Sequence, residues 1–240
     1  MTDATLPPSP APPSSIAAVV FDLDDTLFDC LGQCVGPAHR EAARAMVEAG
    51  AKGTVDELLE ARLALADVER DVDAAVAAAF RSVNPMKVAE TGRRAFYDRD
   101  PGPLTAFPFT RDVLARVRAL ARVVLLSIGH PPTQRRKLVA LGLEAAFDEV
   151  LLEDVFAQGS TRPTKEAALE SFLRRSGLSP SQVLVVGDRP DAEIAAALKL
   201  GMRAMRIRGG EFAARPTPPG VPEAPDVRAV LDLVGARPPA

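Results

Sequence analysis

Three carboxylates follow the first apolar run of the chain. Residues 17–21 are continuously apolar and lead directly into Asp22, Asp24 and Asp25. A short run of this kind is typical of a strand buried on both faces, as in a parallel sheet. Burying a carboxylate is costly unless it is paired or binds a metal, so we expect these acids where the strand emerges. An extended chain would point Asp22 and Asp24 to the same face.

A second apolar run, residues 182–186, ends in the same way. It is followed by Gly187 and Asp188, with Asp191 and Glu193 close behind. Acids clustered after a buried strand are costly unless they coordinate a hard cation. A charge pattern at the start of a helix explains Asp191 and Glu193 well, but it explains Asp188 poorly.

A hydroxyl and an ammonium lie after other predicted strands. Residues 122–127 form an apolar run that ends in Ser127 and is followed by Ile128 and Gly129. A serine in this place is by itself more often a helix cap than a ligand. Lys165 begins a predicted helix, where a positive charge is unfavourable for the helix itself, and this favours a non-structural role. The plainer alternative is a solvated lysine.

Taken in chain order, these four segments resemble the motifs of the haloacid dehalogenase (HAD) superfamily of phosphohydrolases. The resemblance is carried by Asp22-Leu23-Asp24-Asp25-Thr26-Leu27, by Ser127 with Gly129, by Lys165 and by Gly187-Asp188 with the acids after it. It implies that Asp22 is the nucleophile and that Asp24 is the general acid and base.

The resemblance also assigns the remaining site residues. It implies that Ser127, Ile128 and Gly129 bind the phosphoryl group, although the family usually has Asn where this chain has Ile128. Lys165 is expected to hold the nucleophile and offset charge in the transition state, with Arg162 as a competitor for that role.

The expected cofactor is Mg²⁺, which prefers a few protein oxygens together with water and phosphate. Its predicted ligands are the carboxylates of Asp22 and Asp188, the backbone carbonyl of Asp24, and Asp191. Glu193 is the alternative to Asp191, which we favour because Glu193 lies further into the following helix.

Residues 33–97 are helical in pattern throughout. Thr54 and Glu57 have the spacing of a capping box, and Asn84 precedes a proline at the first helical position. A Pro- and Gly-rich turn at residues 100–103 ends the segment. The resemblance implies that this insertion is a mobile helical cap of the C1 type. The alternative is that it belongs to one compact domain.

The apolar runs predict the fold class independently of the resemblance. Helical patterns alternate with strands expected at residues 122–127, 147–152, 182–188 and 203–208, and a closing helix is expected at residues 226–234. This alternation indicates an α/β, doubly wound parallel sheet, Rossmann-like in the terms of the family. The predicted organisation is a flexible tail at residues 1–15, a core at residues 16–30 and 104–240, and a cap at residues 31–103.

Composition narrows the functional classes. The chain has 240 residues, 47% of them hydrophobic, and a net charge of −3, which gives no electrostatic argument for nucleic acid or a membrane surface. The N-terminus lacks the pattern of a signal peptide, and no apolar run is long enough to span a bilayer. Cys30 and Cys34 provide no disulfide scaffold and fit a cytoplasmic protein. The oligomeric state cannot be read from the sequence.

The sequence therefore predicts a Mg²⁺-dependent phosphatase that hydrolyses a small phosphomonoester through an aspartyl-phosphate. A phosphomutase of the same superfamily, a 2-haloacid dehalogenase and a non-catalytic binding protein are the alternatives. Substrate identity is expected to depend on the cap.

Overall fold

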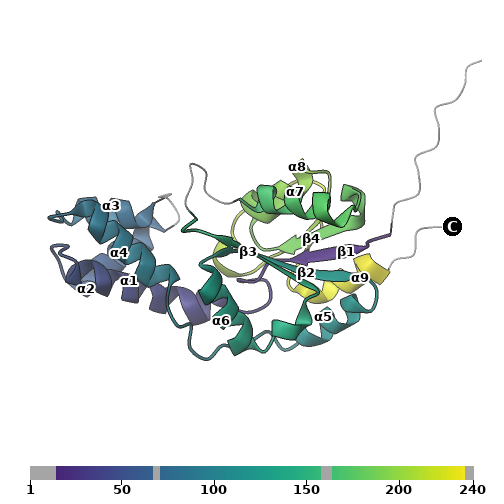
Figure 1. Ribbon diagram of the computed structural model, residues 1–240, viewed down its shortest axis with the longest axis horizontal. Coiled ribbons are helices and arrows are strands. Elements are labelled where there is room, and N and C mark those ends of the chain that lie inside the picture. Colours follow the sequence, from purple (N-terminus) through teal and green to yellow (C-terminus); the bar gives the residue numbers. More distant parts are fainter. Residues whose placement is uncertain (1–14, 67–70, 158–163, 236–240) are drawn as a thin grey trace, which may run out of the picture.

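A single parallel sheet forms the centre of the molecule (Figure 1). The computed structural model describes residues 15–66, 71–157 and 164–235. Within them the strands lie in the order β3-β2-β1-β4-β5-β6. Their bounds are β1 Ala18–Phe21, β2 Arg122–Gly129, β3 Glu149–Asp154, β4 Val183–Gly187, β5 Arg203–Ile207 and β6 Glu223–Ala224. The chain order reverses between β1 and β4, and such a switch point is where open α/β sheets bind ligands.

Helices cover both faces of the sheet (Figure 1). Val19 and Phe21 of β1 pack with α5 (Thr110–Arg118), α6 (Pro131–Leu141) and α9 (Val230–Gly235). Ala18 and Val20 pack with α7 (Lys165–Ser176) and α8 (Ala195–Lys199) on the other face. Alternate side chains of a strand point to opposite faces, so a continuously apolar strand buries both. The predicted doubly wound fold is confirmed.

The segment between β1 and β2 is helical, as expected. A wide π-helical turn at Leu31–Val35 leads into α1 (Gly36–Glu48), α2 (Val55–Leu65), α3 (Val72–Ala79) and α4 (Pro85–Tyr97). The capping box of Thr54 and Glu57 is present, and the Asn84 side chain accepts a hydrogen bond from the backbone N–H of Lys87. We call residues 31–103 the helical insertion.

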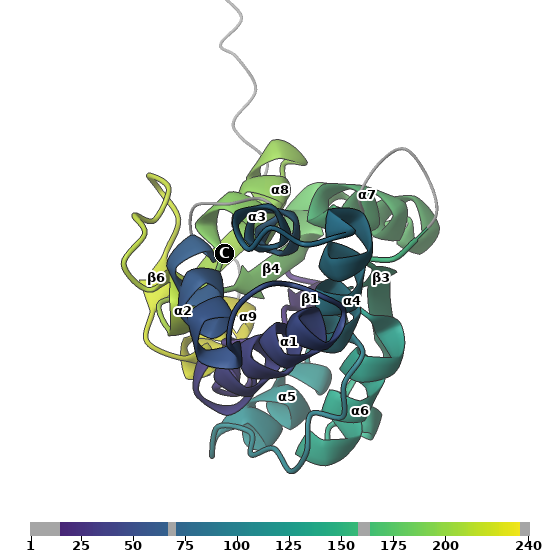
Figure 2. The ribbon, with the colours of Figure 1, turned by 90° about the vertical axis from the view of Figure 1, so that its left-hand side faces the viewer.

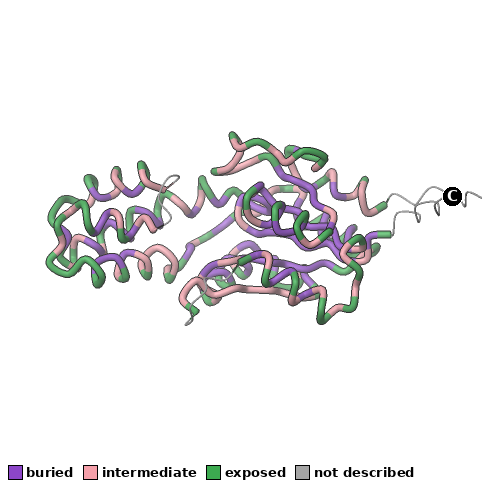
Figure 3. Tube along the Cα trace, turned by 90° about the horizontal axis from the view of Figure 1, so that it is seen from above, coloured by how far each residue is buried: buried purple, intermediate pink, exposed green. Residues whose placement is uncertain are grey.

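The helical insertion lies beyond the carboxyl ends of β1 and β4, in front of the sheet in the end view of Figure 2. It has an apolar core of its own, which includes Met46, Leu58, Val76 and Val88. Figure 3 shows buried residues concentrated along the strands, with a second set along the inner sides of the insertion. The insertion therefore packs largely on itself, at the end of the sheet where the acids emerge.

The two chain segments that join the insertion to the core are linked by hydrogen bonds. The Gln33 amide donates to the Thr105 carbonyl at 3.0 Å and accepts from the Thr105 N–H at 2.8 Å. The Arg99 guanidinium donates to the Cys34 carbonyl at 3.1 Å. The entering and leaving segments are thus fastened to each other beside the carboxyl end of β1.

Several element boundaries differ from the predicted ones. β2 continues to Gly129, because Ile128 and Gly129 pair with Glu153 and Asp154 of β3. The same pairing shifts β3 to Glu149–Asp154 from the predicted residues 147–152. β6 lies in the Pro-rich stretch between β5 and the closing helix, where no strand was predicted, and the closing helix begins with a 3₁₀ turn, Val227–Ala229. Most of the predicted tail and Arg162 lie outside the described residues.

Among the residues that the structure describes, no helix is both long enough and apolar enough to cross a membrane.

Candidate active site

Asp22 is the first residue after β1, and it is almost fully buried. Its carboxylate accepts a hydrogen bond from the Lys165 ammonium, which also donates to the Leu126 carbonyl at 2.8 Å. Lys165 begins α7, where the Thr164 side chain caps the helix by accepting from the Ala167 N–H. The start of α7 therefore delivers a buried cation to Asp22.

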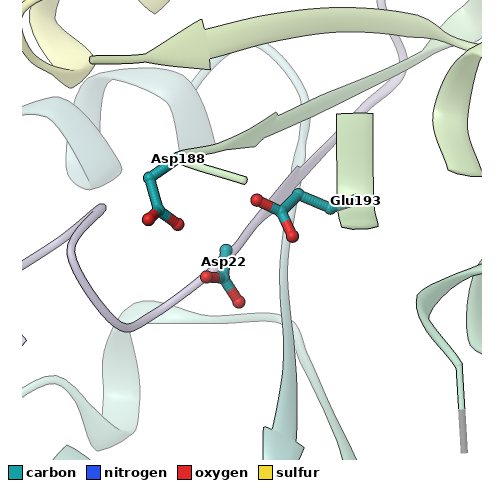
Figure 4. Close-up of side chains that lie close together, drawn as sticks. All are labelled: Asp22, Asp188 and Glu193. Carbon is teal, nitrogen blue, oxygen red and sulfur yellow. The ribbon is translucent and has the colours of Figure 1, made fainter. Parts of the chain in front are cut away.

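Three carboxylates converge at the switch point of the sheet (Figure 4). One oxygen each of Asp22, Asp188 and Glu193 lies within 4.8 Å of the others, and all three residues are buried. Asp22 follows β1, Asp188 follows β4, and Glu193 belongs to the π-helical turn Pro190–Ile194. The meeting of the acids after the two strands follows from the sheet order, because the carboxyl ends of adjacent parallel strands lie at one edge.

Glu193 reaches this cluster because its neighbours leave room for it. A Cβ at position 187 would lie only 2.4 Å from Glu193 Oε1, so a side chain there would displace Glu193 from its present position. The Arg189 N–H donates to Glu193 Oε1 at 2.6 Å, while Glu193 Oε2 is buried without a hydrogen-bond partner in the structure. An unpartnered buried carboxylate oxygen is costly unless a cation or a proton satisfies it.

Asp191 does not join the cluster. Its half-exposed carboxylate pairs with Arg215 at 2.9 Å and lies 3.6 Å from the Arg189 guanidinium. The geometry brings Glu193 to Asp22 and Asp188 instead, contrary to the preference for Asp191. The side chain of Glu193 folds back over Gly187 within the wide turn, and sequence position alone did not indicate this.

Asp24 is held by residues of α6, which covers the face of the sheet opposite to α7. The Lys137 ammonium donates to its two carboxylate oxygens at 2.8 and 2.9 Å, and the Gln134 amide donates to Oδ2 at 3.2 Å. Lys137 and Gln134 belong to α6, whereas Lys165 belongs to α7. Asp22 and Asp24 therefore pair with lysines on opposite faces of the sheet, unlike the side chains of a continuous extended strand, because β1 ends at Phe21 and a turn begins at Asp25.

Ser127 lies next to this arrangement. Its buried hydroxyl accepts a hydrogen bond from Gln134 Nε2 at 2.5 Å. Ile128 and Gly129 complete β2, and a Cβ at Gly129 would come within 3.0 Å of the Gln134 side chain. The structure thus brings Ser127 and Asp24 together through one amide group, while the phosphoryl-binding roles of Ser127, Ile128 and Gly129 stay predictions.

The electrostatics separate the two aspartates of the first motif. Burial raises the pKa of Asp22, with the Lys165 ammonium opposing the shift. Burial also disfavours ionisation of Asp24, but the Lys137 ammonium and the hydrogen bonds outweigh it and lower the pKa of Asp24. Burial and the neighbouring Asp22 carboxylate raise the pKa of Asp188 to about 9 and that of Glu193 to about 7. If all four carboxylates were ionised, their negative charge would exceed the positive charge of Lys137 and Lys165.

This arrangement fits a divalent cation bound by oxygen ligands. Carboxylates are the protein ligands that Mg²⁺ prefers. A cation would stabilise the ionised forms of Asp188 and Glu193, whose pKa values burial and the neighbouring carboxylates raise. The unpartnered Oε2 of Glu193 supports the same reading. The residues present fit Mg²⁺.

Lys137 and Gln134 were not predicted as site residues. The signal in the sequence was their position, since Gln134, Lys137, Leu138 and Leu141 have the i, i+3, i+4, i+7 spacing of one helix face. Two polar side chains on the apolar face of a helix indicate a buried polar partner. That partner is Asp24, which lies more than 100 residues earlier in the chain.

Comparisons with known proteins agree with this geometry. The family model described as haloacid dehalogenase-like hydrolase matches residues 16–201. Glyceraldehyde 3-phosphate phosphatase of Methanopyrus kandleri is 30% identical over 213 residues, which cover 82% of this chain and 86% of the relative. Phosphoserine phosphatase of Thermus thermophilus is 33% identical over 147 residues, 60% of this chain and 54% of the relative.

Solved structures share the fold. YfnB of Bacillus subtilis, assigned to the HAD hydrolases and solved with bound magnesium, has a TM-score of 0.65 at 16% identity, covering 93% of this chain and 100% of that one. L-2-haloacid dehalogenase of Xanthobacter autotrophicus has a TM-score of 0.55 at 19% identity, covering 92% and 98%. With the family model matched over most of its length, the chain belongs to the haloacid dehalogenase-like hydrolases.

Proposed function

We propose that this hydrolase is a Mg²⁺-dependent phosphatase that acts on a small phosphomonoester through an aspartyl-phosphate intermediate. One observation carries the proposal. The Asp22 carboxylate, paired with Lys165, lies beside the acids Asp188 and Glu193, and Asp24 follows two residues later. The relatives named as phosphatases of glyceraldehyde 3-phosphate and phosphoserine support a small phosphorylated substrate.

In the first half-reaction, a carboxylate oxygen of Asp22 attacks phosphorus. The bond between phosphorus and the leaving oxygen breaks, and Asp24, which takes up a proton when the monoester binds, gives that proton to the leaving oxygen. Lys165 orients the Asp22 carboxylate and offsets negative charge on the transferring group. Ser127 donates a hydrogen bond to the phosphoryl oxygens, and Ile128 and Gly129 are the proposed neighbours that bind the same group.

In the second half-reaction, Asp24 acts as a base. It removes a proton from water, the oxygen of that water attacks phosphorus, and the bond to Asp22 breaks to release phosphate. Mg²⁺ held by Asp22, Asp188 and the Asp24 carbonyl, with Glu193 beside it, would supply charge neutralisation for the phosphoryl oxygens. Both half-reactions use the same two aspartates, and Asp24 returns to its starting protonation state.

The helical insertion is proposed to act as the cap, spanning residues 31–103 between two core segments. Its position beyond the carboxyl ends of β1 and β4 supports this role (Figure 2). The two free thiols, Cys30 and Cys34, suit a reducing compartment, so we place the enzyme in the cytoplasm. The partner that we propose is a small-molecule substrate, not a nucleic acid or a membrane.

A phosphatase accounts for the residues better than the alternatives do. A dehalogenase needs neither a leaving-group acid nor a Mg²⁺ site, yet the chain has Asp24 and the cluster of Asp188 and Glu193. A non-catalytic binding protein has no need of a buried Asp22 aligned with Lys165. A phosphomutase shares these residues, so only activity measurements separate it from a phosphatase.

The test is phosphate release from a panel of monoesters that includes glyceraldehyde 3-phosphate and phosphoserine. Wild type, Asp22→Asn and the exposed control Asp56→Asn are each assayed with Mg²⁺ and with EDTA. Release that requires both Mg²⁺ and Asp22, and that survives in the control, is the expected result. Full metal-dependent release by Asp22→Asn would contradict the mechanism. Isomerisation of a sugar monophosphate that needs a sugar bisphosphate and releases no phosphate would favour the mutase. Halide release from 2-chloropropionate in EDTA would favour the dehalogenase.

A further inference from the structure

A buried lysine on α6 has no place in the mechanism above. Lys137 lies on the inward face of α6 together with Gln134, Leu138 and Leu141. Its side chain is 11% exposed, and its ammonium contacts both carboxylate oxygens of Asp24. Burying an ammonium group costs several kcal/mol unless a partner compensates for it. An apolar residue in this position would pack against the core without that cost.

The surroundings of Lys137 offer few other partners. Its Nζ lies 5.9 Å from the centre of the Phe28 ring and 3.8 Å from Cys30 Sγ, both of them weak partners for an ammonium. The ammonium is therefore directed at Asp24. The Asp24 side chain is 33% exposed, so its carboxylate contacts Lys137 and is still partly accessible to solvent.

Gln134 fastens the same carboxylate from a second direction. Its amide nitrogen is shared between Asp24 Oδ2 at 3.2 Å and Ser127 Oγ at 2.5 Å. Gln134 and Lys137 are one helical turn apart, so a single rigid element carries both donors. Catalytic groups held by rigid elements keep the productive geometry better than groups on loops, and a displacement of 1 Å can cost about 10²-fold in rate.

We infer that Lys137 is a positioning residue, supported by Gln134, which holds the Asp24 carboxyl group where it exchanges a proton with the leaving oxygen. The inference rests on the proposed function. Lys137 touches neither the substrate nor phosphorus, and it keeps its own protons. Asp24 gives one proton to the leaving oxygen as the bond to phosphorus breaks.

This role predicts a dependence on the leaving group. An alkoxide is strongly basic and needs a proton as it departs, whereas 4-nitrophenolate is a weak base and departs without one. The kcat/KM value reports the steps up to formation of the phospho-enzyme. Loss of Asp24 positioning therefore lowers kcat/KM for an alkyl monoester and leaves kcat/KM for 4-nitrophenyl phosphate nearly unchanged.

The experiment compares the full-length wild type with Lys137→Met, Lys137→Arg and Gln134→Met. Arg135→Met is the matched control, since Arg135 is exposed on the same helix. Glycerol phosphate and 4-nitrophenyl phosphate are the two substrates, both assayed with Mg²⁺. For Lys137→Met we expect roughly a 10- to 100-fold loss on glycerol phosphate and less than about a 3-fold loss on the aryl ester. Gln134→Met should shift the ratio of the two kcat/KM values in the same direction but by less. Lys137→Arg should keep part of the activity on glycerol phosphate that Lys137→Met loses.

The ratio of the two kcat/KM values is independent of the fraction of folded protein, so a partly unfolded variant still gives a result. Equal losses on both substrates, or no loss on either, would overturn the positioning role of Lys137. Complete absence of monoester turnover by the wild type would instead reject the proposed function, and the inference with it.

Discussion

The sheet core and the helical insertion both bury charged side chains, but they balance them differently. In the insertion, the guanidinium of Arg62 pairs with the Asp73 carboxylate at 2.5 Å. His39 nearby is neutral at physiological pH, because burial and the adjacent Arg62 lower its pKa to about 4. Among the described residues of the insertion, the buried charges therefore cancel.

In the core site, acidic side chains outnumber basic ones among the described residues. Asp22, Asp24, Asp188 and Glu193 converge there, and the ammonium groups of Lys137 and Lys165 face only two of these acids. Burial, together with the neighbouring carboxylates, raises the pKa values of Asp188 and Glu193. A balanced buried pair suits a structural role, whereas an unbalanced buried cluster lowers stability and is explained by a bound ligand. The same kind of substitution should therefore affect stability differently in the two regions.

The largest expected effect is the loss of turnover in Asp22→Asn. We expect phosphate release to fall by roughly 10³-fold or more, because an amide is a poor nucleophile. The free energy of unfolding without metal should change little, because the loss of one of the crowded negative charges offsets the loss of a counter-ion of Lys165, which also interacts with Glu193. Urea denaturation in EDTA measures this, and a marked loss of stability would show that the core charges are balanced after all.

The matched change in the insertion is Asp73→Asn. It leaves the buried guanidinium of Arg62 without its counter-ion, so we expect a loss of about 3 kcal/mol in the free energy of unfolding. Turnover per folded molecule should change little. Replacing both partners, as in Arg62→Met with Asp73→Leu, should recover most of the stability, because apolar groups can replace a buried pair. Urea denaturation of the three variants tests this, and a stable single variant would argue against the pair as a structural element.

A smaller effect is expected from pH on the metal-free protein. Burial and the Asp22 carboxylate raise the pKa of Glu193 from 4.5 to about 7, so between these values the folded protein holds a proton that the unfolded chain has released. The stability that this provides is present below about pH 4.5 and is lost as pH rises towards 7, by about 3 kcal/mol. Denaturation at several pH values in EDTA measures the slope.

Glu193→Gln should flatten that slope, and Mg²⁺ should raise the stability of the wild type at pH 7 because it binds the ionised carboxylates. A slope unchanged in Glu193→Gln would assign the pH dependence to other groups.

The smallest effect is expected from Asp191→Asn. The Asp191 carboxylate pairs with Arg215 on the surface, so its removal should cost about 0.5 kcal/mol at most and change phosphate release less than about 2-fold. Glu193→Gln should raise the Mg²⁺ concentration needed for half-maximal phosphate release by at least about 10-fold. Titration of activity with Mg²⁺ compares the two variants, and a larger effect at Asp191 would restore it as the metal-site acid.

The α/β fold and the order of the four motifs could be predicted because they depend on local pattern. Apolar runs that end in polar residues identify buried strands and the ends from which ligands are reached. The helical insertion was equally readable, since the caps at Thr54 and Asn84 are local signals. Strand ends were less certain, because the pairing of Ile128 with Glu153 decides them.

The sequence by itself determined which residues are close to the carboxyl ends of the strands, and Asp22, Asp24, Lys165 and Asp188 follow from it. Only the tertiary structure decided that Glu193 reaches the cluster while Asp191 turns to Arg215, because that depends on the space left by Gly187 within a wide helical turn. It likewise decided that Lys137 holds Asp24. Partners so distant in sequence meet only when the helix packs on the sheet, and no local pattern encodes that contact.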